Sequence, residues 1–259
     1  MKFGKRLKQQ TEETLPDWKH EFLSYKQLKK LVNLIPLPPP SPIDGYPNAD
    51  TDQFFCLLNQ EIEKLNSFFL GKEEDFIIRH QELQLRIQSV VATCGCNGRQ
   101  PTEWLYDEEM AKIRKEIIDF HGEMVLLENY STINYTGLVK ILKKYDKRTG
   151  CWLRIPFIHK VLNQPFFVTD LVSKLIKECE HTIEMLFPVE EEEVRSRERN
   201  GSVTVAGAGI FRNTVVALAT MQEIRNGSST YGHLSLPPLR LQESDMMNTI
   251  QLTSLVETM

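Results

Sequence analysis

The stretch from Leu58 to Val90, LNQEIEKLNSFFLGKEEDFIIRHQELQLRIQSV, decides the class of fold. Large apolar residues recur in it every seven positions, with Leu58 and Leu65 beside them, at Ile62, Phe69, Phe76, Leu83 and Val90. A seven-residue apolar repeat is typical of a helix that packs lengthwise against another helix at a shallow angle. The spacing therefore predicts a long helix over about residues 52–91.

Outward from this stretch, helical periodicity continues and no strand pattern occurs. A second long helix is predicted over 103–129 from apolar steps of three and four at Met110, Ile113, Ile117, Phe120, Met124 and Leu127. Shorter helices are predicted over 136–148, 156–163 and 168–187, the first of them closed by Gly150. The predicted fold class is all-α: an N-terminal helical hairpin plus an elongated helical bundle with two long core helices and shorter C-terminal helices.

The helices predicted near the N-terminus and in the C-terminal tail complete the predicted division of the chain into domains. The first segment is predicted to form two short helices. Thr14, Pro16 and Asp17 resemble a helix start, and that helix is expected to run to Leu34 before the proline-rich linker. We expect one domain over residues 1–165 and a helix packed on the bundle over 166–188. A flexible tail over 189–259 is expected to hold one amphipathic helix, about 210–226. That helix either docks on the bundle or contacts a partner.

Composition narrows the class of protein. The chain is 41% hydrophobic and 25% charged, as in ordinary globular proteins, and five cysteines without ligand spacing favour neither a disulfide scaffold nor a metal site. No apolar window approaches the length of about 18 residues that a membrane span needs.

The net charge is distributed unevenly along the chain: residues 138–160 hold seven Lys or Arg against one Asp, and residues 1–35 hold eight against four acids. Two basic islands in an acidic chain favour a confined anion site over direct nucleic-acid contact.

The sharper island is a lysine face on one predicted helix. Offsets of 0, 3, 4 and 7 place four lysines on one side, Lys140, Lys143, Lys144 and Lys147. Leu138, Ile141, Leu142 and Tyr145 fall on the opposite side. Such a face can be ordinary solvated surface. Its four like-charge pairs cost roughly 1–2 kcal/mol, however, and a bound polyanion would turn this repulsion into binding energy.

The second island adds a tyrosine. Tyr25 and Lys29 stand one helical turn apart, with Lys26 beside them and Lys2 earlier in the chain. These residues are either solvated surface groups or donors to one set of phosphate oxygens. A single phosphate monoester carries a charge of only about −1.5 to −2, so this many lysines indicate a ligand with several phosphates.

Several motifs in this chain resemble the SPX domain. They are Met1-Lys-Phe-Gly-Lys5, Glu13-Thr-Leu-Pro-Asp-Trp18, the segment from Phe22 to Lys30 and the segment from Asn134 to Lys147. The resemblance covers about residues 1–165, and the C-terminal segment is similar to that of plant stand-alone members. It implies that Tyr25, Lys29 and Lys144 form a phosphate-binding cluster. Lys140, Lys143 and Lys147 would form an adjoining lysine surface, with Lys2 contributing.

The resemblance also implies a function. The chain is expected to sense inositol pyrophosphate or inositol hexakisphosphate without any other cofactor. In the ligand-bound state it would bind and inhibit a MYB coiled-coil phosphate-starvation transcription factor, in the nucleus and also in the cytoplasm. No catalytic arrangement stands out, so an enzyme is not expected. The alternatives are a ligand-independent coiled-coil adaptor and, below it, an enzyme acting on phosphorylated metabolites.

Overall fold

The computed structural model describes residues 3–13, 16–36, 49–95, 103–187 and 213–219. Its elements are α1 (Phe3–Glu13), the 3-10 helix η1 (Pro16–Trp18), α2 (Tyr25–Leu34), α3 (Ala49–Gly95), α4 (Glu103–Thr149), α5 (Arg154–Val161) and α6 (Asp170–Leu186). No strand occurs within these ranges, so the predicted all-α class with two long helices is confirmed.

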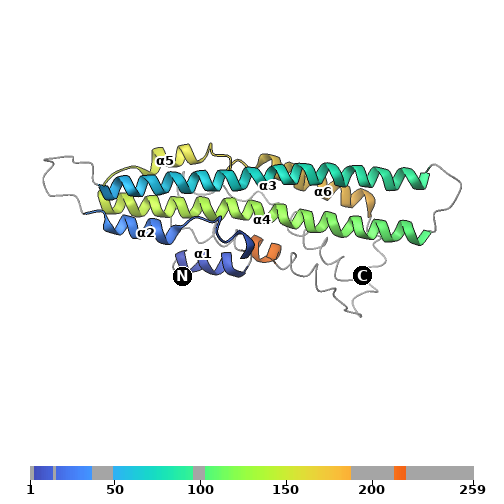
Figure 1. Ribbon diagram of the computed structural model, residues 1–259, viewed down its shortest axis with the longest axis horizontal. Helices are drawn as coiled ribbons and strands as arrows, with labels where there is room; N and C mark the ends of the chain where they lie inside the picture. The colour runs from blue at the N-terminus through green and yellow to red at the C-terminus, as the bar shows by residue number, and fades with distance from the viewer. Residues whose placement is uncertain (1–2, 14–15, 37–48, 96–102, 188–212, 220–259) are drawn as a thin grey trace. The chain divides into compact units, whose positions relative to one another are not determined.

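The chain divides into two compact units, each containing part of α3 and part of α4. Among the described residues, unit 1 comprises 3–13, 16–36, 49–71, 128–169 and 219, and unit 2 comprises 72–95, 103–127, 170–187 and 213–218. In unit 1, α1 and α2 lie along the second half of α4 (Figure 1). Its core contains side chains with no exposed surface, among them Leu28, Val32, Phe54, Leu58, Leu65, Leu138 and Ile141.

Unit 2 packs α6 beside the second half of α3 and the first half of α4 (Figure 1). The rings of Phe76 and Phe120 meet edge to face, 5.5 Å between centroids, at the centre of its core. One face of α6 is buried through Val172, Leu175, Cys179 and Ile183. Apolar residues three and four apart thus bind α6 to its unit, as expected for an amphipathic helix.

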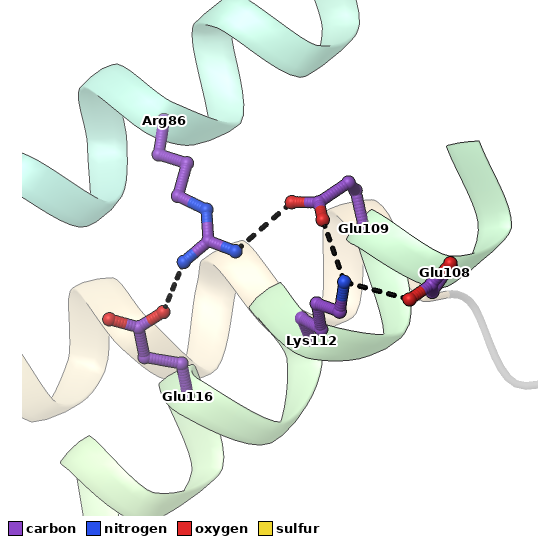
Figure 2. A network of polar contacts seen from close by, with 5 residues as sticks. All are labelled: Arg86, Glu108, Glu109, Lys112 and Glu116. Atoms are coloured by element: carbon purple, nitrogen blue, oxygen red, sulfur yellow. Dashed lines mark hydrogen bonds and ion pairs between the residues drawn. The ribbon is translucent and has the colours of Figure 1, made fainter. Parts of the chain in front are cut away.

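Ion pairs also join the helices of unit 2. Arg86 of α3 donates to two carboxylates of α4, Glu116 at 2.7 Å and Glu109 at 3.1 Å (Figure 2). Lys112 extends the network to Glu108 at 2.8 Å. These side chains are about half exposed, so the network ties the surface of the α3–α4 pair rather than its core.

The heptad stretch behaves largely as predicted. Leu58, Leu65, Phe69, Phe76 and Leu83 are all buried, and α3 is continuous across them. The two outer members of the repeat, Ile62 and Val90, are only partly covered. Since Leu58 and Leu65, on either side of Ile62, are fully buried, the buried stripe at this end follows these two residues rather than the seven-residue repeat.

The prediction of two helices over 103–129 and 136–148 is wrong, because α4 runs unbroken through 47 residues. The polar residues between them, which favour caps and turns, are buried within the helix instead, at Asn129, Ser131, Thr132 and Asn134. Asn134 shows the reason. Its Nδ2 donates to the Tyr130 carbonyl within the same helix at 2.9 Å, and its Oδ1 accepts from the Leu23 backbone N–H, so this oxygen is not free to cap a helix N–H.

The first segment forms two short α-helices, α1 and α2, as predicted, but the predicted start of the second near Thr14 is wrong. Thr14 lies outside the described residues, Pro16–Trp18 forms a single 3-10 turn, and the α-helix begins only at Tyr25. Residues 19–24 are irregular. Side chains of α3 and α4 satisfy their backbone groups, which removes the need for helical hydrogen bonds there.

The remaining predictions divide by position in the chain. Gly150 ends α4 with φ of 73°, a left-handed conformation that glycine adopts without strain, as predicted. The shorter helices α5 and α6 lie within two residues of their predicted bounds.

Most of the tail and of the predicted 210–226 helix lies outside the described residues. Its described part, 213–219, is helical and buries Thr214, Ala217 and Leu218, and the choice between docking and partner contact stays a prediction. The boundaries 1–165, 166–188 and 189–259 stay predictions.

Among the helices of the described part, none is long and apolar enough to cross a membrane.

Candidate anion-binding site

The irregular segment before α2 is fixed by side chains of the long helices. The Leu23 N–H donates to Asn134 Oδ1 at 2.9 Å, and the Ser24 N–H donates to Glu61 Oε2 at 2.7 Å. Lys64 Nζ donates to the Phe22 carbonyl at 2.9 Å, so one more backbone group is satisfied from α3. Because these partners are buried or half-buried, the first turn of α2 has a defined position against α3 and α4.

Tyr25, the first residue of α2, packs on α1. Its ring meets Phe3 edge to face at 5.0 Å, and a Cβ at Gly4 would lie 3.3 Å from the Tyr25 ring. Glycine at position 4 thus allows α1 to approach the ring. Burial raises the pKa of the Tyr25 hydroxyl, so at neutral pH this group stays a hydrogen-bond donor.

The lysine face of α4 has the predicted orientation. The residues opposite the lysines are buried at Leu138, Ile141, Leu142 and Tyr145. Lys143 and Lys147 are exposed, whereas Lys140 and Lys144 are partly covered. Lys140 Nζ lies 5.5 Å from the centroid of the Phe3 ring, a cation–π contact that brings α1 to this face.

A close approach to α4 occurs one turn before Lys140. A Cβ at Gly137 would lie 2.6 Å from Leu23 Cδ2, a distance that real Cβ atoms do not adopt. A larger residue at position 137 would require the buried Leu23 side chain to shift. Gly137 therefore lets Leu23, two residues before Tyr25, pack directly on α4.

Lys144 joins the two basic islands directly. Its Nζ donates to Asn33 Oδ1 of α2 at 2.6 Å. Burial is the largest cause that lowers the pKa of Lys144, followed by the positive charges of Lys29 and Arg148. Lys29 of α2 and Lys144 of α4 are thus close enough to repel each other, although 115 positions separate them in sequence.

Arg148 extends the cluster to the carboxyl end of α2. Its Nε donates to the Ile35 carbonyl at 2.8 Å, and its Nη2 donates to the Asn33 carbonyl at 3.3 Å. The last carbonyls of a helix lack internal partners and carry partial negative charge, so a guanidinium there is favourable. Arg148 consequently holds α2 against α4 at the end of the site.

The structure thus brings Tyr25, Lys29, Lys140 and Lys144 to one place, where α1, α2 and α4 meet. Lys143 and Lys147 lie on the exposed part of the same α4 face. Lys26 is exposed on α2, and Lys2 lies outside the described residues. Sequence reasoning missed Phe3, Asn33 and Arg148. The last two follow Lys29 and Lys144 by four residues each, and this spacing on a helix could have indicated them.

The chemistry of this cluster is that of an anion site. Lysine and arginine have donors only, and the Tyr25 hydroxyl can donate as well. Within the described part of the chain, no carboxylate forms an ion pair with Lys29, Lys143, Lys144 or Lys147. The same part contains no group of three or more His, Cys, Asp or Glu placed to hold a metal ion.

Fold and site together define a class: an all-α protein in which a short helical hairpin and a long helix present a cluster of cationic side chains. The sequence pattern of the SPX domain matches residues 1–41 and 96–161. The SPX domain-containing protein 3 of Arabidopsis thaliana is 53% identical, with 98% of each chain covered. The SPX domain-containing protein 5 of Oryza sativa subsp. indica is 50% identical, covering 95% of this chain and 92% of that one.

A solved structure is also similar. It is the SPX domain of Chaetomium thermophilum Glycerophosphodiester Phosphodiesterase 1 in complex with inositol hexakisphosphate, with a TM-score of 0.58 and 28% sequence identity. The similarity covers 72% of this chain and 99% of that chain. The chain belongs to the family of SPX domain-containing proteins, as its sequence motifs predict.

Proposed function

We propose that this protein senses phosphate status by binding an inositol polyphosphate, either inositol hexakisphosphate or an inositol pyrophosphate. The contact between Lys144 and Asn33 carries the proposal, because it joins the Tyr25–Lys29 island on α2 to the lysine face of α4. The similar SPX domain of the fungal enzyme, whose structure contains inositol hexakisphosphate, supports the choice of ligand.

The proposed site consists of two groups of residues that bind different phosphates of the ligand. Tyr25, Lys29 and Lys144 form the phosphate-binding cluster, where the partial burial of Tyr25 and Lys144 strengthens their interaction with phosphate oxygens. Lys140, Lys143 and Lys147 form an adjoining surface that meets further phosphates, and Lys26 and Lys2 add charge around it. No cofactor other than this ligand is needed.

The number of lysines selects for a ligand with many phosphates. An exposed ion pair contributes only about 0.2–1 kcal/mol, so one inorganic phosphate meeting one or two lysines binds weakly. A compact ring with several phosphates contacts all of these lysines at once. The contributions of the separate contacts then add within one binding event. Screening by salt weakens such binding, so affinity should fall as ionic strength rises.

The output we propose is regulation of transcription rather than catalysis. Ligand binding converts a self-repelling basic face into a neutralised surface that a protein partner can approach. We propose that this partner is a MYB coiled-coil phosphate-starvation transcription factor, which the bound chain inhibits in the nucleus and also in the cytoplasm. Direct contact with nucleic acid is not part of the mechanism. The sequence motifs shared with plant stand-alone SPX proteins support this part of the proposal.

Calorimetry with inositol hexakisphosphate tests the site. Simultaneous replacement of Lys140, Lys143 and Lys147 by alanine should lower the affinity about 3- to 150-fold, since three contacts of about 0.2–1 kcal/mol each are removed. The matched control replaces three exposed lysines of unit 2, Lys115, Lys174 and Lys177. The control should keep its affinity apart from a small change due to net charge. Equal losses in both triple variants would refute the assignment of the site.

A capture experiment separates the proposal from a ligand-independent adaptor. A MYB coiled-coil transcription factor should be retained on the immobilised chain when inositol pyrophosphate is present and released when it is absent. An adaptor based on the long helices would retain the factor equally in both conditions. Turnover of the ligand, followed by phosphorus NMR, would instead indicate an enzyme.

A further inference from the structure

Asn33 is an uncharged side chain within an otherwise cationic cluster. Its Oδ1 accepts from Lys144 Nζ at 2.6 Å, and its own carbonyl accepts from Arg148. We propose that Asn33 is a positioning residue of the anion site, which holds the Lys144 ammonium toward α2 so that its remaining donors face the ligand. This inference rests on the proposed function.

Lys144 needs such a partner because its neighbours repel it. Lys29 and Arg148 are the two charges that act on it, and both are positive. A lysine side chain has four rotatable bonds, so an unrestrained ammonium would move away from these charges into solvent. The short hydrogen bond to Asn33 opposes that motion. The Lys144 side chain is then ordered before the ligand binds, so the entropy cost of ordering it no longer reduces the affinity.

The chemical type of residue 33 matters as much as its position. An amide oxygen accepts one hydrogen bond from an ammonium without neutralising its charge. A carboxylate at this place would form an ion pair with Lys144, occupy it and repel the phosphates of a ligand. A neutral acceptor orients the lysine and leaves the full positive charge available to an anion.

Asn33 is itself held firmly enough to orient another group. It belongs to the last turn of α2, where the Ile35 N–H donates to the Leu31 carbonyl at 3.3 Å. Arg148 binds the carbonyls of Asn33 and Ile35 from α4. Lys144 and Arg148 are one turn apart on α4, so the two cations bind residue 33 through its side chain and its backbone respectively. The acceptor is thus fixed relative to the helix that carries Lys144.

A double-mutant cycle tests the inference, with inositol hexakisphosphate affinity measured by calorimetry on the full chain. Asn33→Ala should weaken binding about 3- to 10-fold, the usual cost of ordering one long side chain. The same substitution in a Lys144→Ala background should cost nothing more, because Asn33 acts through Lys144. Asn33→Asp should weaken binding further than Asn33→Ala. Gln27→Glu, an equal charge change at an exposed position of α2, should have a smaller effect.

The outcomes separate the inference from the proposed function. Wild-type affinity in Asn33→Ala, or an equal loss in both backgrounds, would overturn the positioning role and leave the site assignment intact. Absence of binding by the wild-type chain would overturn the proposed function and this inference with it. Because Asn33 is exposed, the melting temperature of Asn33→Ala should stay within about 2 °C of wild type. A larger drop, with the same loss in both backgrounds, identifies a merely structural residue.

Discussion

Units 1 and 2 use the same two long helices but are held together by different kinds of polar contact. In unit 1, side chains of α3 and α4 bind backbone groups of the segment before α2, as Asn134 and Glu61 do. In unit 2, side chains of regular helices bind one another, as in the pairs of Arg79 with Glu123 and of Arg86 with Glu116. The candidate site belongs to the unit with the irregular backbone.

The difference follows from what each unit must satisfy. A helix satisfies its own interior backbone groups, so helices that only pack need few polar side chains from their neighbours. An irregular segment leaves N–H and C=O groups that cost free energy when buried without a partner. Unit 1 contains buried polar residues such as Asn134 and Glu61 for this purpose. They also place the start of α2 where Tyr25 can join the lysine face.

Truncation of a core side chain in either unit should have the largest effect on stability. Phe54→Ala in unit 1 removes a ring stacked on Tyr145 at 5.0 Å, and Phe76→Ala in unit 2 removes one packed on Phe120. Both phenylalanines have no exposed surface. Each variant should lose about 3–5 kcal/mol of unfolding free energy in chemical denaturation.

Hydrogen exchange shows where each loss acts. Phe54→Ala should reduce protection chiefly in α2 and the second half of α4, and Phe76→Ala chiefly in α6 and the first half of α4. Exposed Leu85→Ala serves as the control and should change little. Identical exchange patterns for the two core variants would show that the division into two units has no energetic counterpart.

Asn134→Ala should have the next largest effect, and it acts on unit 1 alone. The substitution leaves the Leu23 N–H buried without its acceptor, which should cost about 1–3 kcal/mol. Displacement of the segment before α2 should also weaken inositol hexakisphosphate binding, although Asn134 itself is buried away from any ligand. Denaturation and calorimetry on the same preparation measure both quantities.

Asn163→Ala is the matched control for Asn134→Ala. Its Nδ2 also donates to the carbonyl four residues earlier, at 3.1 Å, but the residue is exposed. Water can replace that bond, so stability should change by less than about 0.5 kcal/mol. If Asn134→Ala were equally mild, side-chain support of the irregular segment would not distinguish unit 1 from unit 2.

The same contrast explains what the sequence could predict. Apolar spacing is a local property, and it correctly predicted α3, the lysine face of α4 and the buried side opposite that face. Asn134 was misleading because a buried asparagine and a helix-ending asparagine look alike in sequence, and only the distant Leu23 N–H distinguishes them. Asn33 was also missed. Its spacing from Lys29 could have placed it on the same helix face, but its bond to Lys144, 111 positions away, follows from no local pattern.

Salt should distinguish the polar contacts of unit 2 from those of unit 1. Arg86→Ala breaks both of its bonds to α4, at Glu109 and Glu116, and these half-exposed pairs are screened by ions (Figure 2). We expect the melting temperature to fall by about 1–3 °C at low ionic strength and by less in 1 M salt. Asn134→Ala should keep its effect at both salt concentrations. An Arg86→Ala deficit that does not change with salt would show that its packing, rather than its charge, matters.

The smallest predicted effect concerns Asp119 of unit 2, a carboxylate whose ionised form is disfavoured by its surroundings. Burial is the main cause that raises the pKa of Asp119, Glu123 adds to it, and Lys115 and Arg79 oppose it. Since the folded state holds the proton more tightly than the unfolded state, ionised Asp119 costs stability above its folded pKa and costs nothing below the unfolded value of about 3.9. Asp119→Asn should therefore raise the melting temperature slightly at pH 7, by less than about 2 °C because solvent screens a half-exposed group. The gain should shrink as the pH of the melting series is lowered toward 4, whereas exposed Glu82→Gln should show no comparable gain. A gain that stays constant with pH would assign the effect to packing of the amide, and unit 2 would then contain no electrostatic penalty at this position.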